Sequence, residues 1–373
     1  MIDNPIRVCF VDLGAYPLLT KKDMGFVGGS SVQQVLLANE ITKHKFNVSF
    51  ITYGDGKEHN EFIGHINIVK TYQIEDIPKM SILKKVWNIW RALAEVNADI
   101  YFHESGTSGV VSLYCYLTRK RFVRYISSDA EVNRDMLKYL GGIGRLGNWL
   151  DIKLADAVIA QSVNQQKMLK DNFGRDSYII KNAFPFSDRQ KSPKKNNPPV
   201  VLWVSTIRTI KQPELFLELA KEIPDANFQI IGGAEINNTT IYDSIRDKSD
   251  NISNLHFVGF VPFHEIDQYF EAASVFVNTS KYEGFPNAFI QAWIHSIPTI
   301  TLNADPDGLI YENKMGFYSK TFEQMVEDVK LLSEDRQLRE EMGTNGRRYV
   351  EANHNVANIV GQYIDVFKRI MHD

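Results

Sequence analysis

The residue types best suited to chemistry gather in one stretch of the C-terminal half. It reads Asn278-Thr279-Ser280-Lys281-Tyr282-Glu283-Gly284-Phe285-Pro286-Asn287-Ala288-Phe289-Ile290-Gln291-Ala292-Trp293. Gly284 permits an unusual backbone turn, and Pro286 suits the first turn of a helix, whose free amides and dipole would form an anion site. Asn287 and Gln291 lie four residues apart and share one face of that helix, just after Glu283. This combination suits a sugar nucleotide, whereas the alternative is a loop with a capped helix.

A second candidate site is a pair of cations, Arg208 and Lys211, which follow the apolar run Val200–Ser205. The pair lies in a loop between this predicted strand and a helix that begins near Pro213. Both cations would face a cleft at the end of the strand, where they could grip a diphosphate. The alternative is two solvated surface charges.

The N-terminal half carries weaker motifs. The glycines of Gly25-Phe26-Val27-Gly28-Gly29-Ser30-Ser31 would let backbone amides approach a substrate, but their spacing fits neither a dinucleotide fingerprint nor a Walker loop. His103 ends a predicted strand at the cleft side, where a catalytic role competes with a structural one.

Metal binding has little support in the sequence. Asp305-Pro306-Asp307 has the D-x-D spacing of some metal–diphosphate sites, but acid pairs near Pro and Gly are also common turn residues. The nine histidines and two cysteines show no clustered ligand spacing. We therefore expect neither a metal nor a cofactor.

These candidate residues follow strands of a predicted α/β architecture. Apolar runs rich in Val, Ile, Phe and Tyr alternate with helical periodicity, which is typical of βα units and a parallel sheet. The first series has predicted strands at Ile6–Val11, Val48–Tyr53, Ile66–Val69, Asp99–His103, Phe122–Ile126 and Ala157–Gln161, and predicted helices at Gln33–His44, Ile82–Val96 and Asn148–Ala155. The second has strands at Val200–Ser205, Phe228–Ile231, His256–Phe260, Val275–Asn278 and Thr299–Leu302, and helices at Glu214–Lys221 and Gln324–Leu332.

A polar, Pro-rich segment separates the two series and predicts a linker. We expect an N-terminal domain over residues 1–185, a linker over 186–199 and a C-terminal domain over 200–355. Residues 356–373 have apolar side chains every three or four positions and predict an amphipathic helix. Two doubly wound domains would bind ligands in a cleft between the carboxyl ends of their strands.

Composition bounds the class of protein. The 373 residues suffice for two domains, and a net charge of −3 argues against a nucleic-acid binder that works by broad charge neutralisation. Two cysteines far apart in sequence favour a reducing compartment. The first five residues carry an acid where a secretory signal has positive charge, and no run approaches the ~18 apolar residues of a membrane span. These features predict a cytoplasmic protein.

One helix has features of a membrane surface. Ser81–Val96 places isoleucine, leucine, valine and tryptophan side chains along a broad stripe, with Lys84, Lys85 and Arg91 elsewhere. With the basic run from Arg119 to Arg124, this helix could dock on an anionic membrane. The alternative is a helix packed on the sheet with a solvated basic face.

The motifs together resemble a family 4 glycosyltransferase of the GT-B fold. The resemblance rests on Gly28-Gly29-Ser30, on the stretch from Val204 to Lys211, and above all on Glu283-Gly284-Phe285-Pro286-Asn287, which opens the Glu-x7-Glu motif of the family. It implies an enzyme of the hexosyltransferase type (EC 2.4) with two Rossmann-like domains and transfer with retention at the anomeric carbon, without a required metal. The donor would be a UDP-, GDP- or ADP-sugar held mainly by the C-terminal domain, and the acceptor a glycan or lipid-linked molecule in the N-terminal domain.

The resemblance also implies roles for single residues. Arg208 and Lys211 would neutralise the diphosphate, Glu283 would orient the donor sugar, and the amides around Phe285–Asn287 would touch sugar or phosphate. Gly28 and Gly29 would contact the donor from the N-terminal domain. The tail helix would cross back to that domain.

Three departures from the family pattern stand out. The second motif glutamate is Gln291, so a charge-assisted bond to the ribose becomes neutral, a loss of about 1 kcal/mol. Only two residues separate Arg208 from Lys211, fewer than the four or five usual in the family. The family histidine after the strand ending at Ile126 is replaced by Ser127-Ser128-Asp129, and Asp129 or His103 would take part of its role.

The sequence therefore favours a cytoplasmic retaining glycosyltransferase of polysaccharide biosynthesis, peripheral to the inner face of the plasma membrane if the helix Ser81–Val96 docks there. A non-catalytic glycosyltransferase-like binding subunit is a rival, favoured by Gln291 and the missing histidine. A sugar-nucleotide epimerase of the same fold is a second rival.

Overall fold

The computed structural model describes residues 5–22, 25, 28–56, 59–104, 109–138, 140–186, 198–235 and 238–372. Most of the predicted linker, 187–197, and residues 26 and 27 of the glycine run lie outside this range. The chain divides into two compact units. One comprises Met1–Thr20, Gly28–Ala183 and Val356–Asp373, and the other comprises Lys21–Val27 and Phe184–Asn355.

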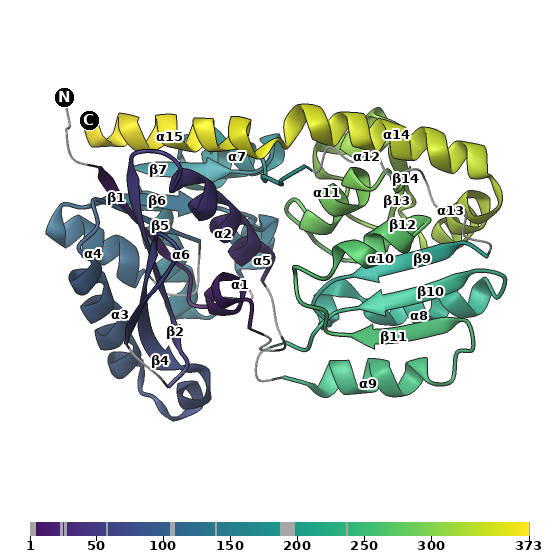
Figure 1. Cartoon of the computed structure of the whole chain (residues 1–373), viewed down its shortest axis with the longest axis horizontal. Coiled ribbons are helices and arrows are strands. Elements are labelled where there is room, and N and C mark those ends of the chain that lie inside the picture. Colours follow the sequence, from purple (N-terminus) through teal and green to yellow (C-terminus); the bar gives the residue numbers. More distant parts are fainter. Residues whose placement is uncertain are drawn as a thin grey trace. The chain divides into compact units, whose positions relative to one another are not determined.

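The first unit is built on an eight-stranded sheet with the order β3-β4-β2-β1-β5-β6-β7-β8 (Figure 1). Its strands are β1 (Ile6–Val11), β2 (Phe46–Gly54), β3 (Asn60–Ile63), β4 (Ile66–Gln73), β5 (Ile100–His103), β6 (Arg121–Tyr125), β7 (Ala157–Ala160) and β8 (Tyr178–Ile179). Neighbouring strands pair in parallel, except that the edge strand β3 runs antiparallel to β4. Parallel strands need crossover helices, so helices cover both faces of this sheet.

The helices of the first unit are α1 (Tyr16–Thr20), α2 (Gly29–Ile41), α3 (Ile82–Val96), α4 (Val110–Thr118), α5 (Arg134–Leu137), α6 (Gly142–Leu154), α7 (Val163–Phe173) and α15 (Val356–His372). Residues of α3, α4, α6 and α7 share one core with one face of the sheet. On the other face α15 lies beside α2, and Phe367 of α15 contacts Phe46 and Phe102. The tail helix therefore completes the core of the first unit.

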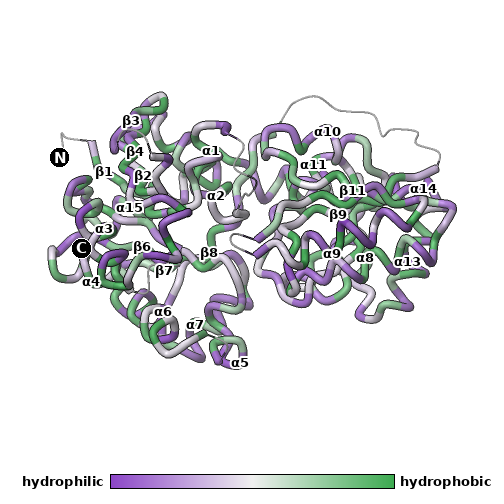
Figure 2. Tube along the Cα trace, turned by 90° about the horizontal axis from the view of Figure 1, so that it is seen from below, coloured by the Kyte–Doolittle hydropathy of each residue, from purple (hydrophilic) through white to green (hydrophobic). Residues whose placement is uncertain are grey.

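The second unit has a six-stranded parallel sheet with the order β11-β10-β9-β12-β13-β14. Its strands are β9 (Val200–Val204), β10 (Asn227–Ile231), β11 (Leu255–Gly259), β12 (Val275–Asn278), β13 (Thr299–Thr301) and β14 (Gly316–Tyr318). Its helices are α8 (Pro213–Glu222), α9 (Thr240–Ser249), α10 (Asp267–Ala272), α11 (Asn287–Ile294), α12 (Leu309–Glu312), α13 (Phe322–Glu334) and α14 (Arg336–Asn353). Figure 2 shows β9 as a hydrophobic segment, and its middle residues are fully buried.

A glycine brings two loops of the second unit together. A Cβ atom on Gly232, just after β10, would lie 1.9 Å from the carbonyl oxygen of Ser205, just after β9. Only glycine permits this approach, so the carboxyl ends of β9 and β10 stay closely packed beside the candidate site.

Candidate functional site

The topology of the second sheet brings the two predicted loops together. From β9 the chain moves to β10 and β11 on one side, then returns so that β12 lies on the other side of β9. The carboxyl ends of β9 and β12 thus flank a topological switch point, where open α/β sheets bind ligands. Arg208 and Lys211 follow β9, and Glu283 follows β12.

Hydrogen bonds join these two loops directly. The Lys281 amide donates to the Ile210 carbonyl at 2.8 Å. The Thr279 hydroxyl donates to the Lys211 carbonyl at 2.7 Å and accepts from the Trp203 indole at 2.9 Å. Because Trp203 is buried in the core, these bonds fix both loops to the rigid part of the unit.

Lys211 and Glu283 form an ion pair at the centre of the site. Lys211 Nζ lies 2.6 Å from Glu283 Oε1, and the two side chains are 12% and 11% exposed. The same oxygen accepts from Ser280 Oγ at 2.6 Å and from Asn278 Nδ2 at 3.3 Å. Burial alone would raise the pKa of Glu283, but the charge of Lys211 and these hydrogen bonds lower it below its ordinary value. Glu283 is therefore a carboxylate at neutral pH.

Several polar groups of the site have no partner within the described part of the chain. Glu283 Oε2 accepts no hydrogen bond there, because the bonds of this carboxylate all go to Oε1. The Arg208 guanidinium is exposed and forms no ion pair or hydrogen bond with a described residue. The side chain of Gln291 is buried and likewise has no described hydrogen-bond partner. An acceptor, a cation and an amide are thus available to a ligand.

The start of α11 completes this site. Pro286 is the residue immediately before the helix, in an extended conformation, and no side chain caps the first turn. Phe285 is buried, with its ring 5.1 Å from that of His354 and 6.2 Å from that of Trp293. Phe285 therefore anchors the loop, while Gly284 and Asn287 lie on either side of this anchor and are partly exposed.

In the first unit, His103 and Glu104 lie at the equivalent switch point, between β1 and β5. His103 is 1% exposed, and its Nδ1 lies 2.6 Å from the Val11 carbonyl oxygen, to which it donates. Burial, together with the charge of Arg124, lowers the pKa of His103 to about 3. The imidazole is therefore neutral at neutral pH and holds the ends of two strands together.

Asp129 begins a short 3-10 helix after β6. Its carboxylate accepts from Gln165 Nε2 at 3.0 Å and from Asn164 Nδ2 at 3.2 Å. These bonds orient Asp129 against the start of α7. A catalytic role for Asp129 or His103 stays a prediction.

Glu104 is a polar residue of this edge that the motifs do not identify. The Ser127 hydroxyl hydrogen-bonds to Glu104 Oε1 and lies 2.7 Å from Glu131 Oε1. The hydroxyl has a single proton, so it cannot donate fully to both carboxyl groups at once. Burial and the charge of Glu131 raise the pKa of Glu104 to about 7, so Glu104 keeps its proton up to about neutral pH. Its place directly after a predicted strand is the signal that could have found it.

The remaining motifs have clear local positions. Gly28 is the residue before α2, and Gly29 is its first residue, so both lie at the N-terminus of a 13-residue helix.

The acid pair of the D-x-D spacing lies in a turn. The Asp305 carboxylate accepts from the backbone amides of Ile310 and Tyr311, as expected for a turn residue. No group of three or more His, Cys, Asp or Glu side chains within the described ranges could hold a metal ion. No described helix combines the length and apolarity that a membrane span requires.

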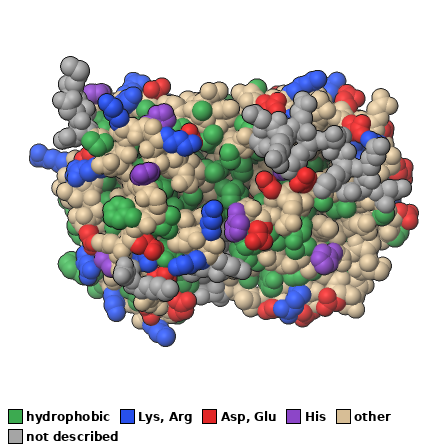
Figure 3. Space-filling model, viewed as in Figure 1, with side chains coloured by type: hydrophobic (Ala, Val, Ile, Leu, Met, Phe, Trp, Pro, Cys, Tyr) green, Lys and Arg blue, Asp and Glu red, His purple; other side chains and the backbone are tan. Residues whose placement is uncertain are grey.

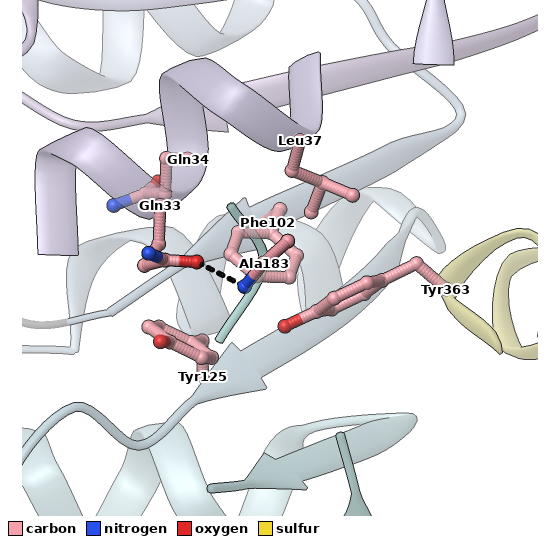
Figure 4. A pocket seen from close by; sticks show the side chains of 7 residues that line it. All are labelled: Gln33, Gln34, Leu37, Phe102, Tyr125, Ala183 and Tyr363. Carbon is pink, nitrogen blue, oxygen red and sulfur yellow. Dashed lines mark hydrogen bonds between the residues drawn. The ribbon is translucent and has the colours of Figure 1, made fainter. Parts of the chain in front are cut away.

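A small pocket lies inside the first unit, between α2, the sheet and α15 (Figure 4). It is lined by Gln33, Gln34, Leu37, Phe102, Tyr125, Ala183 and Tyr363. Gln33 Oε1 accepts from the Ala183 amide at 2.7 Å, whereas Gln34 Oε1 is buried without a described partner. This pocket has the size for a bound water rather than for a sugar.

Comparison with solved structures defines the fold class as GT-B. Sucrose-phosphate synthase from Thermosynechococcus elongatus matches with a TM-score of 0.81 at 16% identity, over 98% of this chain and 99% of that one. The Anabaena protein HepE in complex with UDP-glucose matches with a TM-score of 0.77 at 16% identity, over 98% of this chain and all of that one. The two parallel-sheet α/β units agree with the predicted fold class.

Sequence comparison defines the family. The model for glycosyl transferases group 1 matches residues 186–349, and the model for glycosyltransferase family 4 matches residues 27–186. An uncharacterized glycosyltransferase of Haemophilus influenzae is 23% identical over 87% of this chain and 92% of its own length. The O-antigen biosynthesis glycosyltransferase WbnH of Escherichia coli is 24% identical over 78% of this chain and 86% of its own. The chain is a group 1 glycosyltransferase.

Proposed function

We propose that this glycosyltransferase moves a hexose from a nucleotide-diphosphosugar to a glycan or lipid-linked acceptor, with retention at the anomeric carbon and without a metal. The observation that carries the proposal is the convergence of Arg208, Lys211 and Glu283 at the switch point of the second sheet. Two cations and a carboxylate on one rigid edge suit a ligand with an anionic diphosphate and a polar sugar.

The donor would use Lys211 of the ion pair together with the groups left without described partners. Arg208 and Lys211 would neutralise the diphosphate, and Glu283 Oε2 would accept from a hydroxyl of the donor sugar. The buried amide of Gln291 would hydrogen-bond to the ribose, one helical turn after Asn287. The presence of UDP-glucose in the similarly folded HepE supports a UDP-sugar, with GDP- and ADP-sugars as the alternatives.

The chemical step would depend on charge stabilisation. As the bond between the sugar and the diphosphate breaks, negative charge grows on the departing oxygen. Fixed cations and the uncapped amides at the start of α11 would stabilise that charge more strongly in the transition state than in the ground state. This arrangement needs no protein nucleophile and no metal.

The acceptor would lie at the carboxyl edge of the first sheet. Asp129 and Glu104 present carboxyl groups there, and His103 would position the end of β5. The N-terminus of α2, with Gly28 and Gly29, would supply backbone amides to the donor rather than to the acceptor. The name of the Escherichia coli relative supports a role in polysaccharide biosynthesis, and we place the reaction in the cytoplasm.

Analysis of the anomeric product by proton NMR tests the stereochemistry. The purified chain would be incubated with each nucleotide-sugar and a panel of acceptors, and the coupling constant of the new anomeric proton would be measured before mutarotation. Retention supports the proposal, and an inverted product refutes it. Isomerised donor without an acceptor would identify an epimerase, and binding without any turnover would identify a non-catalytic subunit.

A further inference from the structure

We propose that the outer faces of α3, α4 and α6 form one docking surface for an anionic lipid bilayer. We call this surface the three-helix face. The proposal goes beyond the glycosyltransferase activity, because it concerns a different part of the first unit and does not require that the transfer chemistry be correct. It extends the single amphipathic helix expected from the sequence to three neighbouring helices.

The outward side of α3 is apolar where a helix of a globular domain is normally polar. The inner side packs Ile89 and Leu93 into the core. On the outside, Leu83 is 81% exposed and Trp87 is 65% exposed, with Arg91 one turn further on. A helix packed on a sheet needs only one apolar stripe, so the second stripe requires another explanation.

The other two helices repeat this pattern. On α4, Leu113, Tyr116 and Leu117 are exposed at helical spacing. Along α6 the exposed apolar side chains are those of Ile143, Leu146 and Trp149. Single exposed apolar residues are normal on a protein surface, but contiguous groups of them mark interaction sites.

The three helices lie side by side, so their stripes join. The Trp90 ring of α3 lies 5.1 Å from the Tyr114 ring of α4. A Cβ atom on Gly109, at the start of α4, would lie 3.2 Å from the Cα atom of Gly147 in α6. These close contacts place the exposed apolar side chains of α3, α4 and α6 on neighbouring helices of one face.

The charge on the three-helix face selects the occupant. Four basic side chains on these helices or at their ends are exposed and have no ion pair within the described ranges, namely Lys84, Arg91, Arg119 and Arg145. The acids of the three helices are engaged: Glu95 bonds to His59 and Asn60, and Asp151 is buried against Ser112. Arg124, expected from the sequence to join this face, is instead fully buried and paired with Glu131.

Tryptophan, tyrosine and leucine side chains beside unpaired cations match the interface of an anionic bilayer. The aromatic rings and leucines would enter the boundary between headgroups and acyl chains, and the cations would contact lipid phosphates. Figure 3 shows hydrophobic and basic side chains together where Figure 1 places α3 and α4. A protein partner would not require this excess of unpaired positive charge.

Vesicle cosedimentation of the full chain tests the proposal. The probes are phosphatidylcholine vesicles with and without 30% phosphatidylglycerol, at low and high salt. We expect binding that needs the anionic lipid and weakens with salt. Because each basic side chain near such a surface contributes about a fivefold effect, Lys84→Ala with Arg91→Ala should weaken binding about 25-fold.

Replacing the exposed apolar side chains by serine provides a second test of the proposal. Leu83→Ser with Trp87→Ser should weaken binding by at least 10-fold, with an unchanged circular dichroism spectrum and melting temperature as evidence of folding. Tyr311→Ser is the matched control, because this side chain is 79% exposed in the second unit. The proposal is overturned if anionic vesicles do not bind the chain, or if the control variant loses as much binding as the α3 variant. It is also overturned if sedimentation velocity shows a dimer that the α3 variant abolishes, since the occupant is then a second copy.

Discussion

Replacing Lys211 by methionine should destabilise the second unit as well as stop transfer. The substitution keeps an unbranched side chain, shorter by one atom, but leaves the carboxylate of Glu283 without its cation. Both groups are largely buried, and the bond between them is 2.6 Å long. Ser280 and Asn278 still donate to Glu283, but neutral donors do not replace a full positive charge.

The size of this effect follows from the burial. Removing one partner of a buried ion pair costs about 3–5 kcal/mol, because an unpaired charge stays in the interior. With a urea m-value of about 2 kcal/mol/M, a loss of 3 kcal/mol lowers the unfolding midpoint by about 1.5 M. Adding Glu283→Gln removes the stranded charge, so the double variant should recover most of this loss.

Tryptophan fluorescence can report on the second unit alone. Trp203 and Trp293 are buried there, so the urea titration would use a background in which the three other tryptophans, at positions 87, 90 and 149, are phenylalanine. In the native pair the pKa of Glu283 is lowered, so its stabilisation is complete above the ordinary pKa and is lost as pH falls through the lower folded value. Without Lys211 the buried carboxyl is easier to protonate, so the deficit of the variant should shrink between pH 8 and pH 4.

Two results would refute this reasoning. Equal midpoints for the wild type and Lys211→Met would show that the ion pair does not stabilise the fold. A double variant no more stable than Lys211→Met would show that the loss does not come from the stranded carboxylate.

Three further predictions concern single side chains. Arg208→Ala should lower the transfer rate about 100-fold in steady-state assays with no change in the unfolding midpoint, because the guanidinium is exposed. The control variant Lys248→Ala removes an exposed cation of α9 and should keep most of the rate. Similar losses in both variants would speak against a specific role of Arg208. Gln291→Glu should tighten nucleotide binding about 5-fold by calorimetry, because the ribose bond gains a charge; weaker binding would disprove the ribose contact. For Glu104, whose pKa is raised to about 7, the ionised form is disfavoured in the folded state. The free energy of unfolding of the wild type relative to Glu104→Gln should therefore fall by about 3 kcal/mol as pH rises from about 4.5 to 7, measured by urea unfolding. A difference that does not change with pH would contradict the raised pKa.

The sequence was sufficient to predict most of the strands and the loops that follow them. The ranges Ile6–Val11, Ile82–Val96 and Val275–Asn278 coincide with β1, α3 and β12. Each is a buried or amphipathic run, and polar or turn-forming residues mark where it ends. Helix α4 was missed, since its sequence VVSLYCYLT is rich in β-branched and aromatic residues that also favour strands. The edge strand β3 was missed because its four residues are too few to show alternation.

The partners of the site residues could not be predicted in the same way. Arg208, Lys211 and Glu283 were identified from their types and positions after strands. That Lys211 binds Glu283, while Arg208 stays without a described partner, depends on strand order across 72 residues. The same holds for Glu104, whose raised pKa depends on burial and on the charge of Glu131, which the fold brings near.

Release of nucleoside diphosphate from a panel of UDP-, GDP- and ADP-sugars tests the central claim most directly. The purified chain would be incubated with each donor, with and without acceptors, and the released diphosphate measured by ion-exchange chromatography beside the Arg208→Ala variant. We predict release from at least one donor and a rate about 100-fold lower in the variant. No release from any donor, or equal rates in the two proteins, would contradict the assignment of the donor site to the carboxyl ends of β9 and β12.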